Sequence, residues 1–243
     1  MMYHQFLPHP ALSKYIDAYW VVRNDDAVPH ATRILPDGCV DIIVNIGEEF
    51  IDEDRSTIKH GCAFLVGTMT HYIDTTNSPG THLIGIRFKP LGFSAFYKFA
   101  SLHEIANMAV ALEKEFIPAV HQLDANSVNY LDSYFVSRLS KPSHTLSHLV
   151  DHITRHHGNI AVDSLSRQYA MSPRKLERSF KQHLGVSPKE FINFKRYQYA
   201  MTLIRQRRSR TSLLDIALDC GYYDHSHLTN EIRKYSGLTP SAL

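Results

Sequence analysis

The chain has 243 residues, which is enough for two domains of ordinary size that each bury a core of their own. With 44% hydrophobic and 21% charged residues, its composition is that of a soluble globular protein, and no apolar run approaches the roughly 20 residues that a membrane helix needs. The net charge of +2 hides an asymmetry: residues 1–143 carry 11 Lys and Arg against 16 Asp and Glu, whereas residues 144–243 carry 15 against 8, which favours a polyanionic partner for the second half.

The first hundred residues carry mostly strand and turn signals. Pro36-Asp37-Gly38 is a turn sequence between two strand-like runs, and the acidic stretch 48–55 is expected to be a solvated loop. Strands are predicted where β-branched and aromatic residues cluster, at 15–22, 33–35, 40–46, 63–66 and 82–88. Several short strands separated by turns indicate a β-barrel or a sandwich.

From about residue 101 the hydrophobic period becomes that of a helix. Helices are therefore predicted within 102–139, and Pro118 interrupts or begins one of them. The apolar positions at helical spacing are Leu102, Ile105, Ala106, Ala109, Leu112, Phe116, Val120, Leu123, Val128, Leu131, Phe135 and Leu139. Such helices either form a dimer interface or pack against the barrel, and the sequence leaves both alternatives open.

The best domain boundary is Lys141-Pro142-Ser143, because proline breaks a helix and Ser143 or Thr145 can cap the next one. It divides the chain into domains at 1–140 and 144–243. The second domain begins with an amphipathic helix that ends near Gly158 and has its apolar face at Leu146, Leu149, Val150 and Ile153.

Residues 163–188 resemble a helix-turn-helix. Ser172 is a good N-cap, Pro173 has a preset φ, and Gly185 supplies a left-handed stop, so 172–184 is predicted to be one short helix. Upstream, a second short helix is predicted around Leu165 and Tyr169, with a tight corner at Ala170-Met171.

The predicted helix 172–184 has two different faces. Leu176 and Phe180 lie four residues apart and form an apolar edge that faces a core. The opposite edge is basic and carries Arg174, Lys175, Arg178 and Lys181. A basic helix edge of this length fits a DNA major groove.

A second copy of this pattern lies 52 residues further along the chain. The shift places core, basic and helix-stop positions onto residues of the same kind, which indicates an internal duplication. Leu176 falls on Leu228, Phe180 on Ile232, Lys181 on Arg233, Gly185 on Gly237, Val186 on Leu238, Ser187 on Thr239 and Pro188 on Pro240.

Between the two copies, residues 189–207 predict a single helix of about five turns. A rigid connection matters because two recognition helices enter successive major grooves on one face of DNA only if they lie about 34 Å apart. The basic residues at its end either lie near backbone phosphates or belong to a solvated loop; these are Arg205, Arg207, Arg208 and Arg210.

The second copy carries residues that resemble the second helix-turn-helix of the AraC/XylS family of bacterial transcription regulators. They are Asp215-Ile216-Ala217, Cys220-Gly221-Tyr222, His225-Ser226-His227-Leu228 and Gly237-Leu238-Thr239-Pro240, and 163–188 resembles the first motif of that family. The segments 35–44 and 85–93 are similar to the amino-terminal domain of a subset of these regulators, which resembles the family's cupin-like sensor.

This resemblance implies an α+β protein with an amino-terminal β-barrel or cupin-like domain and flanking helices, followed by an all-α domain of two helix-turn-helix motifs joined by a long helix. It implies a sequence-specific regulator of transcription that binds double-stranded DNA. A small-molecule effector, a second copy of the chain and RNA polymerase are the further partners considered. An effector-independent DNA-binding protein is the alternative within this class.

In the first motif, the resemblance assigns the base-reading positions to Arg174, Glu177 and Arg178. Either arginine can make bidentate contacts to guanine, and Glu177 can accept from cytosine N4 or pair with Lys181 one turn away. The residues expected to contact phosphates are Ser172, Lys175 and Lys181.

In the second motif, Leu228 and Ile232 are expected to face inward. The family usually has an aromatic residue at the position of Ile232. The outward residues expected to contact bases are His225, Ser226, Thr229 and Asn230, with Arg233 on a phosphate. This face carries less charge than the first, so we expect it to contribute less affinity.

Sixteen histidines raise the alternative of a cupin-type metal-dependent enzyme. His152 and His156 lie four apart, but no His-x-Glu-x-x-His or Cys-x-x-Cys pattern sets a coordination geometry. A DNA-repair methyltransferase with a similar helix-turn-helix would need a cysteine-rich zinc site, and the three cysteines are too scattered. An adaptor that no longer bound DNA would be expected to have lost the charge at these exposed positions, which this chain retains.

We therefore expect no enzymatic activity, no metal and no cofactor. The start of the chain lacks the basic and then apolar order of a signal peptide, so a cytoplasmic protein without a membrane contact is expected.

Overall fold

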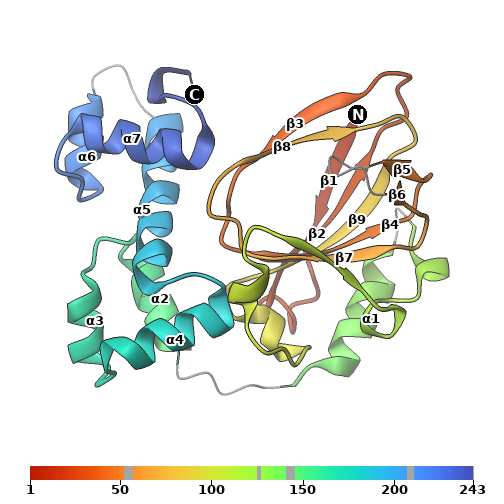
Figure 1. The fold of residues 1–243 in the computed structure, drawn as a ribbon, viewed down its shortest axis with the longest axis horizontal. Coiled ribbons are helices and arrows are strands. Elements are labelled where there is room, and N and C mark those ends of the chain that lie inside the picture. The colour runs from red at the N-terminus through yellow and green to blue at the C-terminus, as the bar shows by residue number, and fades with distance from the viewer. Residues whose placement is uncertain (52–56, 125–126, 141–145, 207–210, 243) are drawn as a thin grey trace.

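The computed structural model describes residues 1–51, 57–124, 127–140, 146–206 and 211–242. A β-rich domain and a helical domain lie side by side, and Figure 1 shows the long helix α5 upright between the two ends of the helical domain. The predicted α+β class is confirmed. The proposed boundary at 141–143, together with Thr145, lies outside the described residues.

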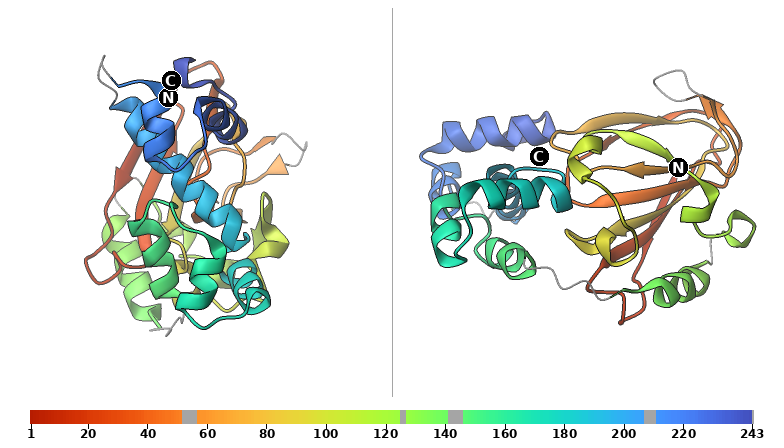
Figure 2. Two further views of the ribbon diagram at one scale, coloured as in Figure 1. Left: turned by 90° about the vertical axis from the view of Figure 1, so that its left-hand side faces the viewer. Right: turned by 60° about the horizontal axis from the view of Figure 1, so that its bottom comes forward.

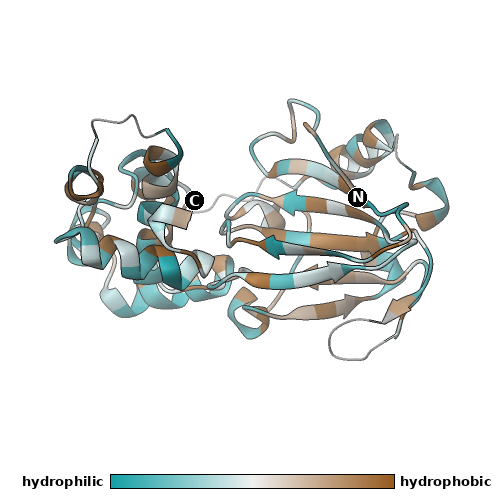
Figure 3. Cartoon of the chain, turned by 90° about the horizontal axis from the view of Figure 1, so that it is seen from above, coloured by the Kyte–Doolittle hydropathy of each residue, from teal (hydrophilic) through white to brown (hydrophobic). Residues whose placement is uncertain are grey.

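A six-stranded antiparallel sheet forms the amino-terminal domain. Its strands follow the order β1 (Met2–Phe6), β2 (Ile16–Arg23), β9 (His82–Phe88), β4 (Val40–Asn45), β7 (Ala63–Val66) and β10 (Ala109–Leu112). The ribbon of β3 (His30–Ile34) and β8 (Ile73–Asn77) arches over one face of this sheet and gives the domain its barrel-like form, and β5 (Phe50–Ile51) pairs with β6 (Thr57–Ile58). Hydrophilic and hydrophobic bands alternate along the strands, because successive side chains point to opposite faces (Figure 3).

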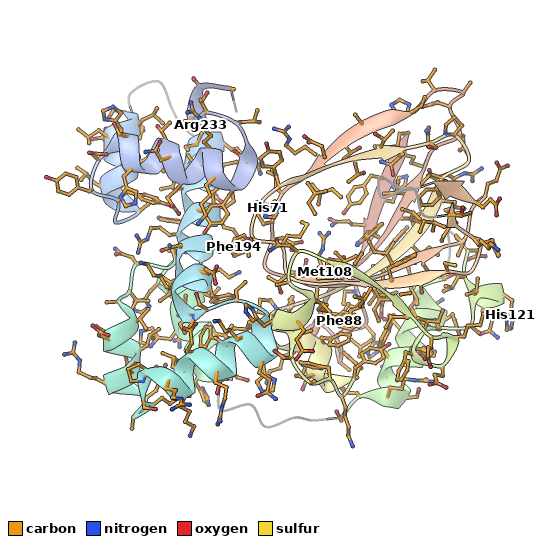
Figure 4. The ribbon with its side chains drawn as sticks, in the orientation of Figure 1. His71, Phe88, Met108, His121, Phe194 and Arg233 are labelled. Carbon is orange, nitrogen blue, oxygen red and sulfur yellow. The ribbon has the colours of Figure 1, made fainter. Side chains whose placement is uncertain are left out.

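The main core lies on the face of the sheet opposite the ribbon. Phe88 of β9 is fully buried among aromatic rings, and its centroid lies 5.4 Å from that of Phe93 in η1 (Gly92–Ala95) and 5.7 Å from that of Phe135 (Figure 4). Phe135 belongs to α1 (Val128–Arg138), which covers this face of the sheet. The predicted strands at 15–22, 40–46, 63–66 and 82–88 all exist, with ends that differ by at most one residue.

The expectation of helices throughout 102–139 is wrong for its first part. Among the described residues of this range, only α1 is an α-helix; the preceding residues form the short 3-10 turns η2 (Leu102–Ile105), η3 (Lys114–Phe116) and η4 (Val120–Gln122), and the strand β10. Residues Ala109–Leu112 pair with β7 and extend the sheet by one strand. A four-residue apolar run fits either period, so the exposed edge of β7 decides its conformation.

The other face of the sheet carries a polar cluster beneath the ribbon. Trp20 Nε1 donates to Asp41 Oδ1 at 2.7 Å, and Arg87 Nε lies 3.3 Å from Asp41 and 3.0 Å from a carboxylate oxygen of Asp37. The indole of Trp20 lies across its register partner Gly85, where an added Cβ would stand 1.8 Å from Trp20 Cε2. Glycine is therefore required opposite this tryptophan.

The helical domain follows the predicted order. Its helices are α2 (Ser147–Arg155), α3 (Val162–Gln168), α4 (Pro173–Leu184), α5 (Pro188–Arg205), α6 (Leu213–Asp219) and α7 (His225–Ser236), followed by the turn η5 (Pro240–Ala242). In Figure 2, α5 runs between α2, α3 and α4 at one end and α6 and α7 at the other. Of the basic residues predicted near its end, Arg205 is its last residue, and Arg207, Arg208 and Arg210 lie outside the described residues.

Helix α5 belongs to two hydrophobic cores at once. Phe191 and Ile192 pack with α2, α3 and α4, whereas the part from Phe194 to Ile204 packs with α6 and α7. A capping box fixes its start: the Ser187 side chain accepts from Glu190 N, and the Glu190 carboxylate accepts from Ser187 N. One continuous helix of 18 residues, about 27 Å long, therefore carries both motifs.

Candidate nucleic-acid interface

The two recognition helices are equivalent residue by residue. The 52-residue shift carries α4 (Pro173–Leu184) onto α7 (His225–Ser236) from first residue to last. Each begins at an N-cap whose side chain accepts from the third amide of the helix, Ser172 from Lys175 N and Asp224 from His227 N. Each ends at a left-handed glycine, Gly185 or Gly237. The internal duplication seen in the sequence is thus a duplication of structure.

Helix α4 buries its predicted apolar edge and exposes its basic one. Leu176 and Phe180 are fully buried, and the turn before the helix is formed by Ala170 with a positive φ. Ser172, Arg174, Lys175 and Arg178 are exposed, and Glu177 and Lys181 are half-buried beside them. Lys181 Nζ lies 3.2 Å from Glu177 Oε1, which is the alternative pairing that the sequence left open for Glu177.

Helix α7 exposes a face with less charge. Leu228 and Ile232 are fully buried, so isoleucine fills the position where the family usually has an aromatic residue. His225, Ser226, Asn230 and Arg233 are exposed, and Figure 4 marks Arg233 on this helix. Thr229 is half-buried, and its hydroxyl donates to His225 O at 2.8 Å. The hydroxyl of Thr229 therefore has a partner within its own helix.

One residue of this face was missed from the sequence. His227 is exposed in the first turn of α7, and its ring packs edge-on against Tyr222 with 5.2 Å between centroids. The repeat already held the signal, because the 52-residue shift places His227 on Lys175, which was predicted to contact phosphate. Likewise Ser226 falls on Arg174, Thr229 on Glu177 and Asn230 on Arg178.

The histidines of α2 have ordinary partners. His152 Nδ1 lies 3.0 Å from the hydroxyl of Tyr169, and the rings of His152 and His156 lie 4.5 Å apart. Within the described part of the chain, no three His, Cys, Asp or Glu side chains gather closely enough to hold a metal ion. In the described residues, no helix is both long enough and apolar enough to cross a bilayer.

Residues 165–243 match the family described as "Helix-turn-helix domain". Over 96 residues the chain is 31% identical to the HTH-type transcriptional activator RhaS of Escherichia fergusonii, an alignment that covers 39% of this chain and 34% of RhaS. Over these residues the chain is similar to HTH-type transcriptional regulators and carries the helix-turn-helix domain. An uncharacterized HTH-type transcriptional regulator of Haemophilus influenzae is 36% identical over 80 residues, which cover 33% of this chain and 26% of that protein. The chain thus spans between about a quarter and a third of the length of the curated relatives it matches.

The amino-terminal domain matches a different family, "Domain of unknown function (DUF6597)", over residues 4–111. Across both domains the fold is similar to that of ToxT from Vibrio cholerae, with a TM-score of 0.50 and 11% identity over 100% of this chain and 97% of that one. The likeness supports the two-domain fold alone. The resemblance inferred from the sequence is confirmed.

Proposed function

We propose that this chain is a sequence-specific regulator of transcription that inserts α4 and α7 into two successive major grooves of one DNA duplex. The observation that carries the proposal is the equivalence of α4 and α7 on a single continuous α5, each helix with its apolar edge buried and its polar edge exposed. A helix with an exposed basic edge gains affinity from phosphates and specificity from base edges.

The proposed roles follow from side-chain chemistry. In α4, Arg174 and Arg178 read guanines, and Glu177 either reads a cytosine or remains paired with Lys181. In α7, Asn230 pairs with adenine, while His225, Ser226 and Thr229 contact neighbouring base edges. The phosphate contacts are assigned to Ser172, Lys175, Lys181 and Arg233, with His227 added because of its place on α7.

The amino-terminal domain is proposed to regulate this binding. An effector changes DNA affinity only if it binds the competent and incompetent states unequally, so a small molecule bound by the barrel would need to alter its contacts with the helical domain. RhaS is named a transcriptional activator, which supports contact with RNA polymerase as a proposal here. A second copy of the chain is a further proposed partner. A regulator of chromosomal genes would act in the cytoplasm of a bacterium.

The deciding experiment is selection of preferred sites from random duplex DNA by the full chain. We expect one asymmetric site with two conserved segments, bound with an affinity that falls steeply as the salt concentration rises. A chain that enriches no sequence and shows no salt-dependent binding to any duplex would contradict the proposal. A thermal-shift screen of small molecules with the same full chain then tests the effector.

A further inference from the structure

The amino-terminal domain contacts both recognition helices at the same backbone position. Thr68 Oγ1, just after β7, donates to the carbonyl oxygen of Leu184 at 2.8 Å. Arg33 Nη1, in β3, donates to the carbonyl oxygen of Ser236 at 3.2 Å. Leu184 and Ser236 are the last residues of α4 and α7 and lie 52 residues apart, so the two accepting carbonyls are equivalent positions of the repeat.

The residue that follows each carbonyl is also pressed against the amino-terminal domain. A Cβ added to Gly185 would lie 3.2 Å from the carbonyl oxygen of Leu102 and from Thr68 Oγ1. A Cβ added to Gly237 would lie 2.7 Å from Arg33 Nη1 and from the ring of Tyr72. Both glycines have a positive φ, so the helix end and the domain contact demand the same residue.

The surroundings of both donors restrict their movement. The hydroxyl of Thr68 belongs to a residue that is only 3% exposed. Two hydrogen bonds of 2.7 Å from Arg33 to Asp74 fix the guanidinium, which also lies 4.2 Å above the ring of Tyr72. The last carbonyls of a helix lack partners within it and carry partial negative charge, which suits both donors.

At α4 the contact is reinforced by η2. Ser101 Oγ donates to Lys181 O at 3.4 Å, and His103 Nδ1 lies 2.9 Å from Gly185 O. Between the two attachments, Gly38 of the β3–β4 turn packs against the ring of Phe194 on α5 (Figure 4). A second body that contacts the ends of both helices restrains α4 and α7 relative to one another in addition to their packing on α5.

We propose that the amino-terminal domain is a positioning frame that sets the spacing and tilt of α4 relative to α7, with Thr68 and Arg33 as the positioning residues. The inference rests on the proposed two-groove binding. A frame of this kind makes the second helix available at the second groove as soon as the first has bound, which raises affinity for correctly spaced sites without a new DNA contact.

The test uses the full chain with Thr68→Val and Arg33→Met, singly and together. Valine keeps the shape of threonine and methionine keeps part of the arginine stem, but neither donates a hydrogen bond. The matched controls are Thr76→Val, an exposed threonine of β8, and Arg23→Met, an exposed arginine paired with Asp25 at the far end of β2. Binding is measured to the selected site, to versions with one or two base pairs inserted between its segments, and to a duplex that keeps one segment.

We expect each single variant to bind the correctly spaced site about threefold to tenfold more weakly, the equivalent of one hydrogen bond, and the double variant to discriminate least between spacings. Binding to the one-segment duplex and by the controls should be unchanged. A double variant that discriminates spacing as the unmodified chain does, or that binds the correctly spaced site more tightly, would overturn the frame.

A second measurement separates this outcome from failure of the DNA-binding proposal. Spin labels at Gln168 on α3 and Leu218 on α6, both exposed, report the distance between the motifs without DNA. We expect a narrow distribution in the unmodified chain and a broader one in the double variant. Equal distributions would refute the frame even if the chain binds DNA, and a broadened distribution would support it even if the chain binds none.

Discussion

Glu177 and Lys181 form an ion pair along α4, with 3.2 Å between Oε1 and Nζ, in the middle of the face proposed to meet DNA. Both side chains are more than a third exposed, so the pair adds little stability. Its main effect is to hold a negative charge where phosphates approach. We predict that Glu177→Gln raises affinity for all duplexes by about twofold to tenfold and steepens the salt dependence, because Lys181 is released. If Glu177 reads a cytosine, the variant would instead lose preference at one base pair in a site selection.

Replacement of Arg178 and replacement of Lys175 by alanine should impair DNA binding in different ways. Arg178→Ala is expected to relax preference at one base pair by about 1–3 kcal/mol, because a bidentate contact to guanine is lost. Lys175→Ala is expected to lower the affinity for all duplexes alike. It should also reduce by about one the slope with which the logarithm of the affinity falls with the logarithm of the salt concentration. Competition binding with single-base variants of the selected site, at several salt concentrations, separates the two. Identical profiles for both variants would contradict the assigned roles.

Arg178 and Asn230 occupy the same position of the repeat, one in each motif. If α4 and α7 enter successive grooves, the base pairs that these residues read lie about one helical turn, or 10 base pairs, apart. We predict that Arg178→Ala and Asn230→Ala each relax a single position and that these positions show this separation. Site selection with both variants measures it, and overlapping positions would exclude simultaneous binding by the two helices. The effect of Asn230→Ala should be the smaller, because α7 presents less charge.

Gly85 gives a test of the barrel that does not depend on DNA. The Cβ of an alanine there would overlap the Trp20 indole, so Gly85→Ala should destabilise the chain by about 1–3 kcal/mol. Trp20 is the only tryptophan, and its emission should shift in the same variant. In a Trp20→Phe background the smaller ring gives room, so thermal unfolding should show a smaller cost for Gly85→Ala. Equal costs in both backgrounds would show that the contact with Trp20 is not the cause.

Asp41 should give the barrel a distinctive dependence on pH. Burial raises the pKa of Asp41 from 3.8 to about 6, although Arg87 opposes the shift. The folded chain therefore holds a proton that the unfolded chain releases, and the stabilising contribution, at most about 3 kcal/mol, is present below pH 4 and lost as the pH rises to about 6. Asp41→Asn keeps an oxygen for Trp20 Nε1 but does not titrate. The difference in unfolding free energy between unmodified chain and variant should change across this range, and a constant difference would contradict the assignment.

The helical domain was predictable because its signals are local. Ser172 and Pro173 lie directly at the start of α4 and Gly185 directly at its end, so both ends of the helix can be predicted from neighbouring residues. The repeat supplied the second motif. His227 has no local signal of its own, and only its alignment with Lys175 in the 52-residue repeat marks it as part of the exposed face.

The barrel and the domain contacts depend on partners distant in sequence. Strand β8 (Ile73–Asn77) is mostly polar and becomes a strand because β3 lies beside it, and Ala109–Leu112 becomes a strand because β7 offers a free edge. The contact of Thr68 with Leu184 joins residues 116 positions apart through one hydroxyl. No periodicity or composition marks such a residue. The assignment of individual side chains to bases and phosphates stays a prediction.

Because α5 belongs to two cores, the number of residues between them sets the rotation of one motif relative to the other about the helix axis. The change from one core to the other occurs between Ile192 and Phe194. One residue inserted there would rotate everything beyond it by about 100° and advance it by about 1.5 Å. Short insertions or deletions at this junction would turn one reading surface away from the duplex, whereas seven residues, close to two full turns, would restore its phase at the cost of about 10 Å of extra length. Substitutions on the exposed face of α5 therefore leave the relative orientation of the two motifs unchanged, whereas insertions and deletions preserve it only when they add or remove whole turns.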